Sequence, residues 1–224
     1  MLRALRRSAA ALRRRVLPRQ IDWKAAFDEP IAAATLVDVG AAHGTPELYA
    51  LAPSAELVLV EPLVEYEPDL RAVLAERPGT WVAAAAGAAE GTVTLQVPSG
   101  APTKASIHRR SPRTALGADS AVREVPLQRL ETILRDTGAR PPFGVKVDTE
   151  GHELEVLRGI GAAVDDIDFL IAEVSVKERF VGGYTFDEFL EATRALGFTT
   201  TAVLSANADR HGVVRYTDLL FERT

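Results

Sequence analysis

Three charged side chains alternate along a short, otherwise apolar run of the chain. Lys146, Asp148 and Glu150 are each separated by one residue, and such alternation places side chains on one side of an extended backbone. Because a buried charge without a partner is costly, the three must share a polar site or face solvent. A carboxylate in such a site can act as a general base. Asp148 is the first candidate for that role and His152 the second, and Lys146 would pair with Asp148 or orient a bound acceptor.

This segment also has a structural interpretation. An exposed charge cluster followed by a capping box at the start of the next helix would give the same pattern. A Mg²⁺ site on Asp148, Glu150 and Glu173 is a less favoured alternative. The four His residues are scattered and the chain has no Cys, so we expect no metal site.

A second candidate site combines a small-residue loop with an acid. Residues 36–44 read Leu-Val-Asp-Val-Gly-Ala-Ala-His-Gly, and Glu61-Pro62 follows the next strand-like run, 21 residues after Gly40. A strand that ends in a small-residue loop lets backbone N–H groups face a ligand. An acid at the tip of the neighbouring strand can accept both hydroxyls of a ribose. We therefore predict a nucleoside-type ligand at this loop, with Glu61 on its sugar and Pro62 beside it.

The loop differs from the Gly-x-Gly-x-x-Gly of dinucleotide sites and offers less room for a pyrophosphate. An adenosyl ligand without phosphates tolerates the tighter loop, and Asp38 would bind the ammonium group of such a ligand. We expect Gly40, Ala41, His43 and Gly44 to surround it. The alternatives are an ordinary strand-to-helix turn for the loop and a solvent-facing turn position for His43.

The elements that must position these residues follow a regular order. From residue 35 onward, short β-like runs alternate with helical runs, which is typical of a parallel sheet with crossover helices. The predicted strands of this sheet are 35–39, 57–60, 81–86, 144–147 and 169–174, and the predicted helices are 46–51, 66–76, 127–136, 153–158 and 186–196. Two consecutive strands, 199–204 and 216–222, indicate an antiparallel hairpin at one edge. We therefore predict an α/β fold with a doubly wound, mostly parallel sheet and an antiparallel C-terminal hairpin.

Two stretches interrupt this order. Residues 92–97 alternate with a period of two and, with 122–126, predict an extra β-hairpin insertion. Residues 98–121 are rich in Ser, Pro, Gly and Arg without periodicity, which is typical of a functional loop. Thr185 and Glu188 predict a capping box at the start of helix 186–196. Tyr184, just before it, could line an acceptor pocket, as could Glu173 at the end of strand 169–174.

The charge is unevenly distributed. Residues 1–20 hold seven Arg and no acid, which leaves 19 basic and 31 acidic side chains in the remainder. We predict an Arg-rich N-terminal helical extension over 1–30 and a single domain over 31–224. The acidic body argues against nucleic acid as a partner, whereas the basic arm could make weak contact with an anionic membrane surface. The chain has no apolar run long enough for a transmembrane helix and no secretory signal, so we expect a cytoplasmic protein.

Six segments together resemble the FkbM family of S-adenosylmethionine-dependent methyltransferases. They are V-D-V-G-A-A-H-G, V-E-P, A-A-A-A-G-A-A-E-G-T-V-T-L, P-L-Q-R-L-E-T-I-L, V-K-V-D-T-E-G-H-E-L-E-V-L-R-G and I-A-E-V, in unbroken order between about residues 35 and 204. The most specific part is K-x-D-x-E-G. The resemblance implies the seven-stranded class I methyltransferase fold and S-adenosylmethionine as the cofactor.

By position, the resemblance also assigns roles to residues. Ala85 falls in the stretch 84–87 that passes the adenine, although Ala83 replaces an Asn that the family often has there. Ser106 matches a Ser in the loop that would cover the acceptor, and Glu150 lies at the expected methyl-transfer point. Ser106, Glu150, Glu173 and Tyr184 are therefore the candidate acceptor-binding residues.

These observations predict O-methylation of a hydroxyl on a carbohydrate or secondary metabolite, with a small molecule or glycan as acceptor. Two alternatives remain from other classes. One is a non-catalytic Rossmann-like binding scaffold. The other is an NAD(P)-dependent oxidoreductase, against which the missing middle glycine of the loop and the absence of a Tyr-x-x-x-Lys pair argue.

Overall fold

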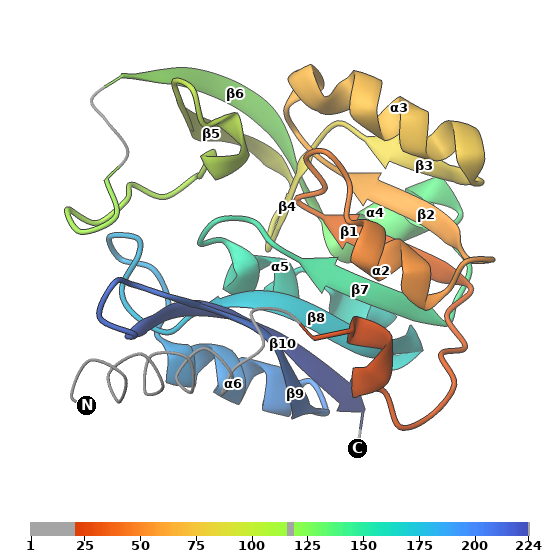
Figure 1. The fold of residues 1–224 in the computed structure, drawn as a ribbon. Helices are drawn as coiled ribbons and strands as arrows, with labels where there is room; N and C mark the ends of the chain where they lie inside the picture. Colours follow the sequence, from red (N-terminus) through yellow and green to blue (C-terminus); the bar gives the residue numbers. More distant parts are fainter. Residues whose placement is uncertain (1–20, 116–118, 224) are drawn as a thin grey trace, which may run out of the picture.

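The main sheet has seven strands in the order β3-β2-β1-β7-β8-β10-β9 (Figure 1). The computed structural model describes residues 21–115 and 119–223. Neighbouring strands from β3 to β8 are parallel, and β10 runs antiparallel to both β8 and β9. The strands are β1 (Thr35–Val39), β2 (Glu56–Val60), β3 (Gly79–Val82), β7 (Phe143–Val147), β8 (Ile167–Ser175), β9 (Phe198–Ala208) and β10 (Val214–Arg223). The predicted fold class and closing hairpin are confirmed.

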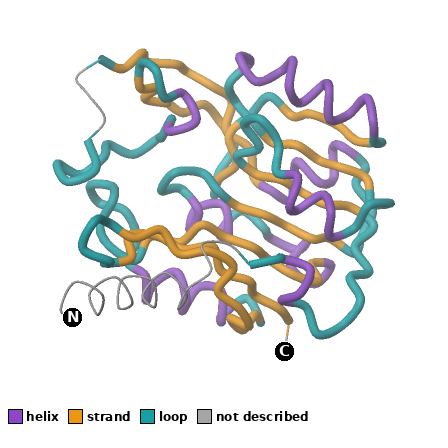
Figure 2. The backbone as a smooth tube through the Cα atoms, viewed as in Figure 1, coloured by secondary structure: helices purple, strands orange, loops and turns teal. Residues whose placement is uncertain are grey.

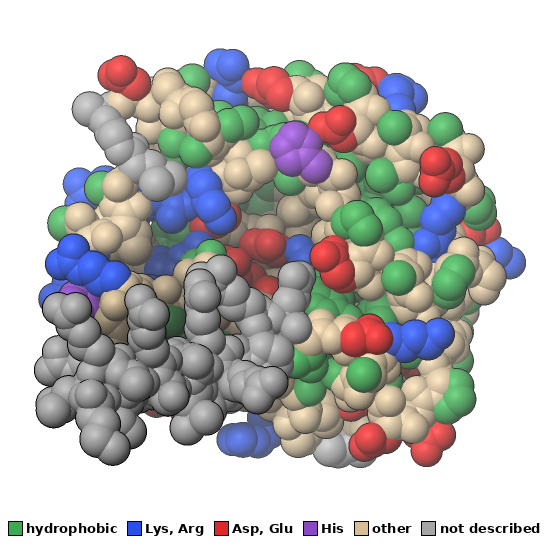
Figure 3. Space-filling view, in the orientation of Figure 1, with side chains coloured by type: hydrophobic (Ala, Val, Ile, Leu, Met, Phe, Trp, Pro, Cys, Tyr) green, Lys and Arg blue, Asp and Glu red, His purple; other side chains and the backbone are tan. Residues whose placement is uncertain are grey.

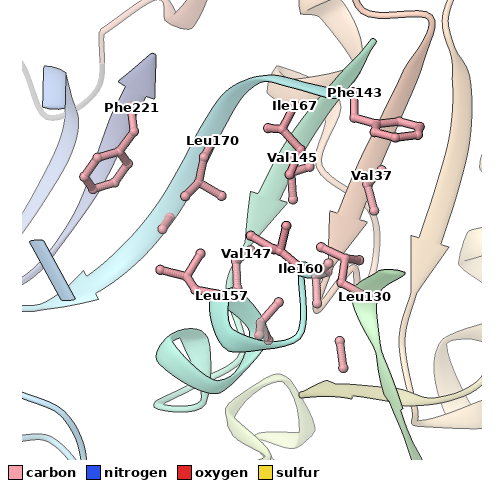
Figure 4. Close-up of a cluster of buried hydrophobic side chains, with 14 of the residues drawn as sticks. Val37, Leu130, Phe143, Val145, Val147, Leu157, Ile160, Ile167, Leu170 and Phe221 are labelled. Carbon is pink, nitrogen blue, oxygen red and sulfur yellow. The ribbon is translucent and has the colours of Figure 1, made fainter. Parts of the chain in front are cut away.

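Helices cover both faces of this sheet. They are α2 (Pro46–Leu51), α3 (Glu67–Glu76), α4 (Leu130–Thr137), α5 (Glu153–Arg158) and α6 (Phe186–Ala195), with the short 3-10 helices η1 (Trp23–Ala26), η2 (Val64–Tyr66), η3 (Pro102–Lys104) and η4 (Gly161–Asp166). Alternation along β1 shows the two layers: Leu36 packs in the core with α2 and α3, whereas Val37 and Val39 pack in the core with α4, α5 and α6. Figure 4 shows part of the second core.

One predicted strand is wrong. The run 81–86 is not a single strand, because β3 ends at Val82 and the chain enters β4 (Ala85–Gly87) in a different sheet. β4 pairs in parallel with β6 (Ser120–Arg129), and β6 pairs antiparallel with β5 (Gly91–Pro98). The predicted extra hairpin is therefore β5–β6, within a separate three-stranded sheet (Figure 2). Because β6 continues to Arg129, the helix predicted from residue 127 begins at Leu130.

The predicted capping box at α6 is confirmed: the Thr185 side chain accepts from the Glu188 N–H, and Glu188 accepts from the Thr185 N–H. Residues 1–20 of the predicted extension lie outside the described residues, and Trp23 is already buried in the core. The boundary at residue 30 therefore stays a prediction. In the part of the chain that the structure describes, no helix is both long and apolar enough to cross a membrane.

Candidate active site

The loop after β1 lies directly against the loop after β7. Gly40 has a φ of 80°, and a Cβ there would lie 1.9 Å from the carbonyl oxygen of Asp148. The Asp148 N–H donates to the carbonyl of Val39 at 2.9 Å. This close approach requires glycine, and it brings the two predicted sites together at the carboxyl ends of adjacent strands.

Glu61 follows β2 and lies beside the same loop. Its carboxylate accepts hydrogen bonds from the backbone N–H of Ala42 at 3.0 Å and of Leu63 at 2.9 Å. Burial raises the pKa of Glu61 to about 7, although these two N–H donors oppose the shift. Ala42, with a φ of 42°, is a loop contact that sequence analysis did not single out.

A cavity opens between these loops and the smaller sheet. Its polar lining includes Glu61, Asp148, Glu150 and His152, and its apolar lining includes Val60, Pro62, Leu63, Tyr66, Ala84, Ala85, Ala86, Leu95, Ala105 and Ile107. Gly40 also lines it, whereas Ala41, His43 and Gly44 do not. The space-filling view shows acidic side chains in a hollow, with Lys and Arg side chains on one side (Figure 3).

Asp38 lies beneath the cavity rather than on its lining. It is buried, accepts a hydrogen bond from the Tyr49 hydroxyl at 2.7 Å, and lies 3.9 Å from Lys146 Nζ. Burial, followed by the Asp38 carboxylate, raises the pKa of Tyr49 above its ordinary value. Binding of an ammonium group by Asp38 stays a prediction, and in this structure its partners are a phenol and a lysine of the chain.

His43 and Gly44 lie on the outer side of the loop. The His43 ring is exposed, lies 2.6 Å from Asp69 Oδ2 and stacks edge-on against Tyr66. A Cβ on Gly44 would lie 3.2 Å from the Tyr49 hydroxyl oxygen. Both residues therefore shape the loop from outside the cavity.

Lys146 and Asp148 form the ion pair that their spacing predicts. Lys146 Nζ lies 3.3 Å from Asp148 Oδ2, and the Asp148 side chain is 32% exposed whereas that of Lys146 is 7% exposed. Burial alone would lower the pKa of Lys146, but the carboxylates of Asp148, Asp38 and Asp218 raise it above its usual range. The lysine is therefore a permanent cation beside Asp148, which lines the cavity.

Glu150 departs from the alternation predicted for it. Its φ of 52° turns the chain out of the extended conformation, and its carboxylate is paired with Lys104 at 2.5 Å, Arg110 at 2.8 Å and Arg179 at 2.5 Å. Glu150 lines the same cavity as Asp148, but its carboxylate pairs with these three cations rather than with Lys146. Its backbone carbonyl accepts a hydrogen bond from the Ser106 hydroxyl at 2.7 Å.

Glu173 is held by the same arginine. Arg179 Nη1 lies 2.5 Å from its carboxylate. Burial, followed by the Asp148 charge, raises the pKa of Glu173 even though Arg179 opposes the shift. Among residues 21–115 and 119–223, no group of His, Asp or Glu is arranged to hold a metal ion.

His152 lines the cavity and pairs with a second histidine. Its Nδ1 lies 3.1 Å from Nε2 of His108. Burial, followed by the neighbouring His108, lowers the pKa of His152 to about 4, so the ring is neutral at physiological pH. Its Nε2 is buried with no hydrogen-bond partner among the described residues.

Tyr184 is engaged away from this cavity. Its hydroxyl donates to Glu153 Oε2 at 2.6 Å, and the ring lines a separate pocket with His108 and Arg158. Ser106 is buried and lies behind the cavity wall that Ala105 and Ile107 form. The acceptor-binding roles of Ser106, Glu173 and Tyr184 stay predictions.

Several residues of the site were not predicted from the sequence. Arg179, Arg110 and Lys104 come from two distant loops and meet at Glu150 only through the fold. The Arg content of residues 98–121 was a visible signal, but nothing in the sequence indicated its partner. Tyr49 has the helical spacing of an ordinary core residue, so its contact with Asp38 was not foreseeable.

The cavity suits an adenosyl ligand. Glu61 presents a carboxylate at one wall, where ribose hydroxyls can donate to it, and the apolar wall of Leu63, Ala85 and Leu95 suits a planar base. The Gly40 loop lets the backbone approach closely. These features fit a nucleoside without requiring a pyrophosphate.

The sequence matches the model of one protein family. A profile of the family described as "Methyltransferase FkbM domain" matches residues 38–200, which include Asp38, Glu61 and the whole K-x-D-x-E-G segment. No curated protein matches the sequence.

Two solved structures with a similar arrangement of elements are distant from this chain in sequence. A methyltransferase FkbM from Methylobacillus flagellatus KT is 17% identical with a TM-score of 0.49, over 84% of this chain and 43% of that one. The magnesium protoporphyrin IX methyltransferase of Synechocystis PCC 6803, solved with bound S-adenosylmethionine, is 13% identical with a TM-score of 0.47, over 90% of this chain and 75% of that one. This chain thus spans less than half the length of the Methylobacillus protein.

The profile covers well over half of the chain, including both halves of the cavity. The chain therefore belongs to the FkbM family of S-adenosylmethionine-dependent methyltransferases, and S-adenosylmethionine is its cofactor.

Proposed function

We propose that the protein methylates a hydroxyl group of a small carbohydrate or secondary metabolite, with Asp148 as the general base. The observation that carries this proposal is that the carboxylates of Glu61 and Asp148 line one cavity. Glu61 would hold the sugar of the cofactor, and Asp148 would receive the proton of the acceptor hydroxyl.

When bound, the cofactor supplies a methyl group on a positively charged sulfur, which an acceptor oxygen can attack. The chain must therefore align the acceptor and take up its proton. Alignment of two reactants can supply roughly 7–11 kcal/mol of the barrier, and a positioned general base contributes about 10²–10⁴-fold. Lys146 Nζ, 3.3 Å from the Asp148 carboxylate, would hold that base in place.

Asp148 is favoured over His152 as the base by its surroundings. The Asp148 carboxylate is 32% exposed, whereas Nε2 of His152 is buried and its Nδ1 is engaged with His108. A pKa of about 4 also makes the His152 ring a weak base at neutral pH.

Paired variants test this assignment. A panel of polyhydroxylated acceptors is first screened with S-adenosylmethionine labelled on its methyl group. We expect Asp148→Asn to bind S-adenosylhomocysteine as the wild type does and to lose about 10²–10⁴-fold in turnover, whereas His152→Gln keeps most of the activity. Full activity of Asp148→Asn would rule out the base, and binding without turnover on any acceptor would favour a non-catalytic scaffold.

A further inference from the structure

We propose that Glu150 is a positioning residue for the cofactor cavity. In this proposal its carboxylate holds residues 102–107, here called the roof segment, against the cavity, and this contact sets how tightly and for how long the cofactor is bound. The inference rests on the proposed function, because it takes the cofactor to occupy this cavity.

The roof segment presents different side chains to its two sides. Ala105 and Ile107 line the cavity, as do Pro102 and Thr103. Lys104 and Ser106 do not line it and instead contact Glu150, which borders the cavity beside the roof segment. Lys104 ends the 3-10 helix η3, and the chain is extended at Ser106, which pairs with Gln96, so that the neighbours of Ser106 point in the opposite direction. The position of the side chains that would touch the cofactor therefore depends on the contacts that Lys104 and Ser106 make with Glu150.

Glu150 is the centre of this arrangement, and both of its carboxylate oxygens are occupied. Lys104 donates to Oε1 at 2.5 Å, and Arg110 and Arg179 donate to Oε2 at 2.8 and 2.5 Å. Three cations on one buried carboxylate leave little capacity for direct binding of an acceptor hydroxyl. The geometry favours a role in holding the cavity wall instead.

Arg179 connects this cluster to the main sheet. Its other guanidinium nitrogen binds Glu173 at 2.5 Å, on β8, and its charge lies over the rings of Phe180 at 5.2 Å and Tyr216 at 4.2 Å. It is 4% exposed. Arg179 is thus fixed against the main sheet, and Asp148 directly follows β7 of that same sheet.

The opposite edge of the roof segment is held differently. Ser106 and Gln96 exchange two backbone hydrogen bonds, at 2.9 and 3.1 Å, which attach the segment to β5 of the smaller sheet. Loss of the Glu150 contacts would leave the roof segment attached mainly through that edge. We therefore expect a looser wall and a faster release of ligand.

The test uses S-adenosylhomocysteine with the full chain. Lys104→Met and Arg110→Met each remove one cation from Glu150, and Arg110→Lys restores the charge. Arg109→Met is the matched control, because Arg109 is exposed and adjacent. Glu150 itself is left intact, since its removal would leave buried cations unpaired and could prevent folding.

We expect calorimetry to show that Lys104→Met and Arg110→Met weaken binding about tenfold, which corresponds to about 1.4 kcal/mol. Surface plasmon resonance should place most of the change in the dissociation rate. Hydrogen exchange of residues 102–107 should accelerate in the ligand-free variants. Arg110→Lys should recover much of the affinity, and Arg109→Met should match the wild type.

The inference would be overturned if both Met variants bind and release S-adenosylhomocysteine as the wild type does. It would also be overturned if they lower only the melting temperature, because that result would make the cluster purely structural. If the wild type itself failed to bind S-adenosylhomocysteine, the proposed function would be contradicted too. A failure of the proposed function therefore shows in the wild type, whereas a failure of this inference alone shows only in the variants.

Discussion

At the residue scale, we expect Glu61 to couple cofactor binding to pH. Burial raises its pKa to about 7 in the free protein, so a substantial fraction is protonated at neutral pH. In the proposed site, ribose hydroxyls would donate to the ionised form, so bound ligand would stabilise the carboxylate, lower its pKa and release a proton. The affinity for the ligand would then be highest at a pH well above 7, and it would fall as the pH drops through 7.

Calorimetry with S-adenosylhomocysteine at pH 8 and pH 6 measures this effect. We expect the wild type to bind about tenfold more weakly at pH 6, as linkage to a group of that pKa requires. Titrations in buffers of different ionisation enthalpy should reveal the released proton. Glu61→Gln should bind weakly with no such dependence, and an equally steep dependence in that variant would assign the effect to another group.

Residue types allowed part of this site to be recognised before the fold was known. The placement of Glu61, Asp148 and Lys146 was predicted from their spacing, because short-range alternation and strand ends predict side-chain placement well; the first two line one cavity, and Lys146 pairs with Asp148. The ion pairs of Glu150 were not predicted, because its φ of 52° breaks the alternation and its partners Arg110 and Arg179 are 40 and 29 residues away. Such long-range ion pairs depend on packing that local pattern does not encode.

Among the structural elements, the β1 loop depends most on a single residue. Gly40 combines a φ of 80° with a backbone approach that leaves no room for a Cβ, 1.9 Å from the Asp148 carbonyl oxygen. Gly100 provides a matched control, since it has a φ of 74° and nothing within 4 Å of its Cβ position. Alanine substitutions at Gly40 and at Gly100 can therefore be compared to separate the cost of backbone strain from the cost of a steric clash.

We expect Gly100→Ala to cost about 1–2 kcal/mol of the free energy of unfolding, which is the strain of the left-handed conformation. Gly40→Ala should cost a further 1–3 kcal/mol or so from overpacking, and it should also abolish binding of S-adenosylhomocysteine by displacing the loop of Asp148. Urea unfolding and calorimetry measure both quantities. Equal stability and equal binding in the two variants would show that the close approach is not required.

The strand boundaries show where pattern analysis fails for whole elements. β1 was predicted at its observed bounds, because it is fully buried and ends at a glycine. The run 81–86 was misassigned, because Ala83 and Ala84 continue an apolar pattern while the chain changes sheets. The partner of β4 is β6, about 40 residues further on, so only the tertiary structure shows the break.

At the scale of the whole molecule, two sheets of different size enclose the cavity that we propose for the cofactor. The main sheet contributes Glu61 and Asp148, and the smaller sheet contributes Leu95 from β5 and Ala85 from β4. The order of strands and helices along the chain, together with the C-terminal hairpin, was sufficient to predict the larger sheet. The separation of the smaller one, and therefore the second wall of the cavity, required the structure.

The central claim is that this cavity binds an adenosyl ligand without phosphates. Calorimetric titration with S-adenosylhomocysteine, beside NAD⁺ on the same preparation, tests it most directly. We predict that S-adenosylhomocysteine binds, that NAD⁺ does not, and that Glu61→Ala weakens the binding at least about tenfold, or 1.4 kcal/mol. Binding of NAD⁺ alone, or an affinity for S-adenosylhomocysteine that Glu61→Ala leaves unchanged, would contradict the account.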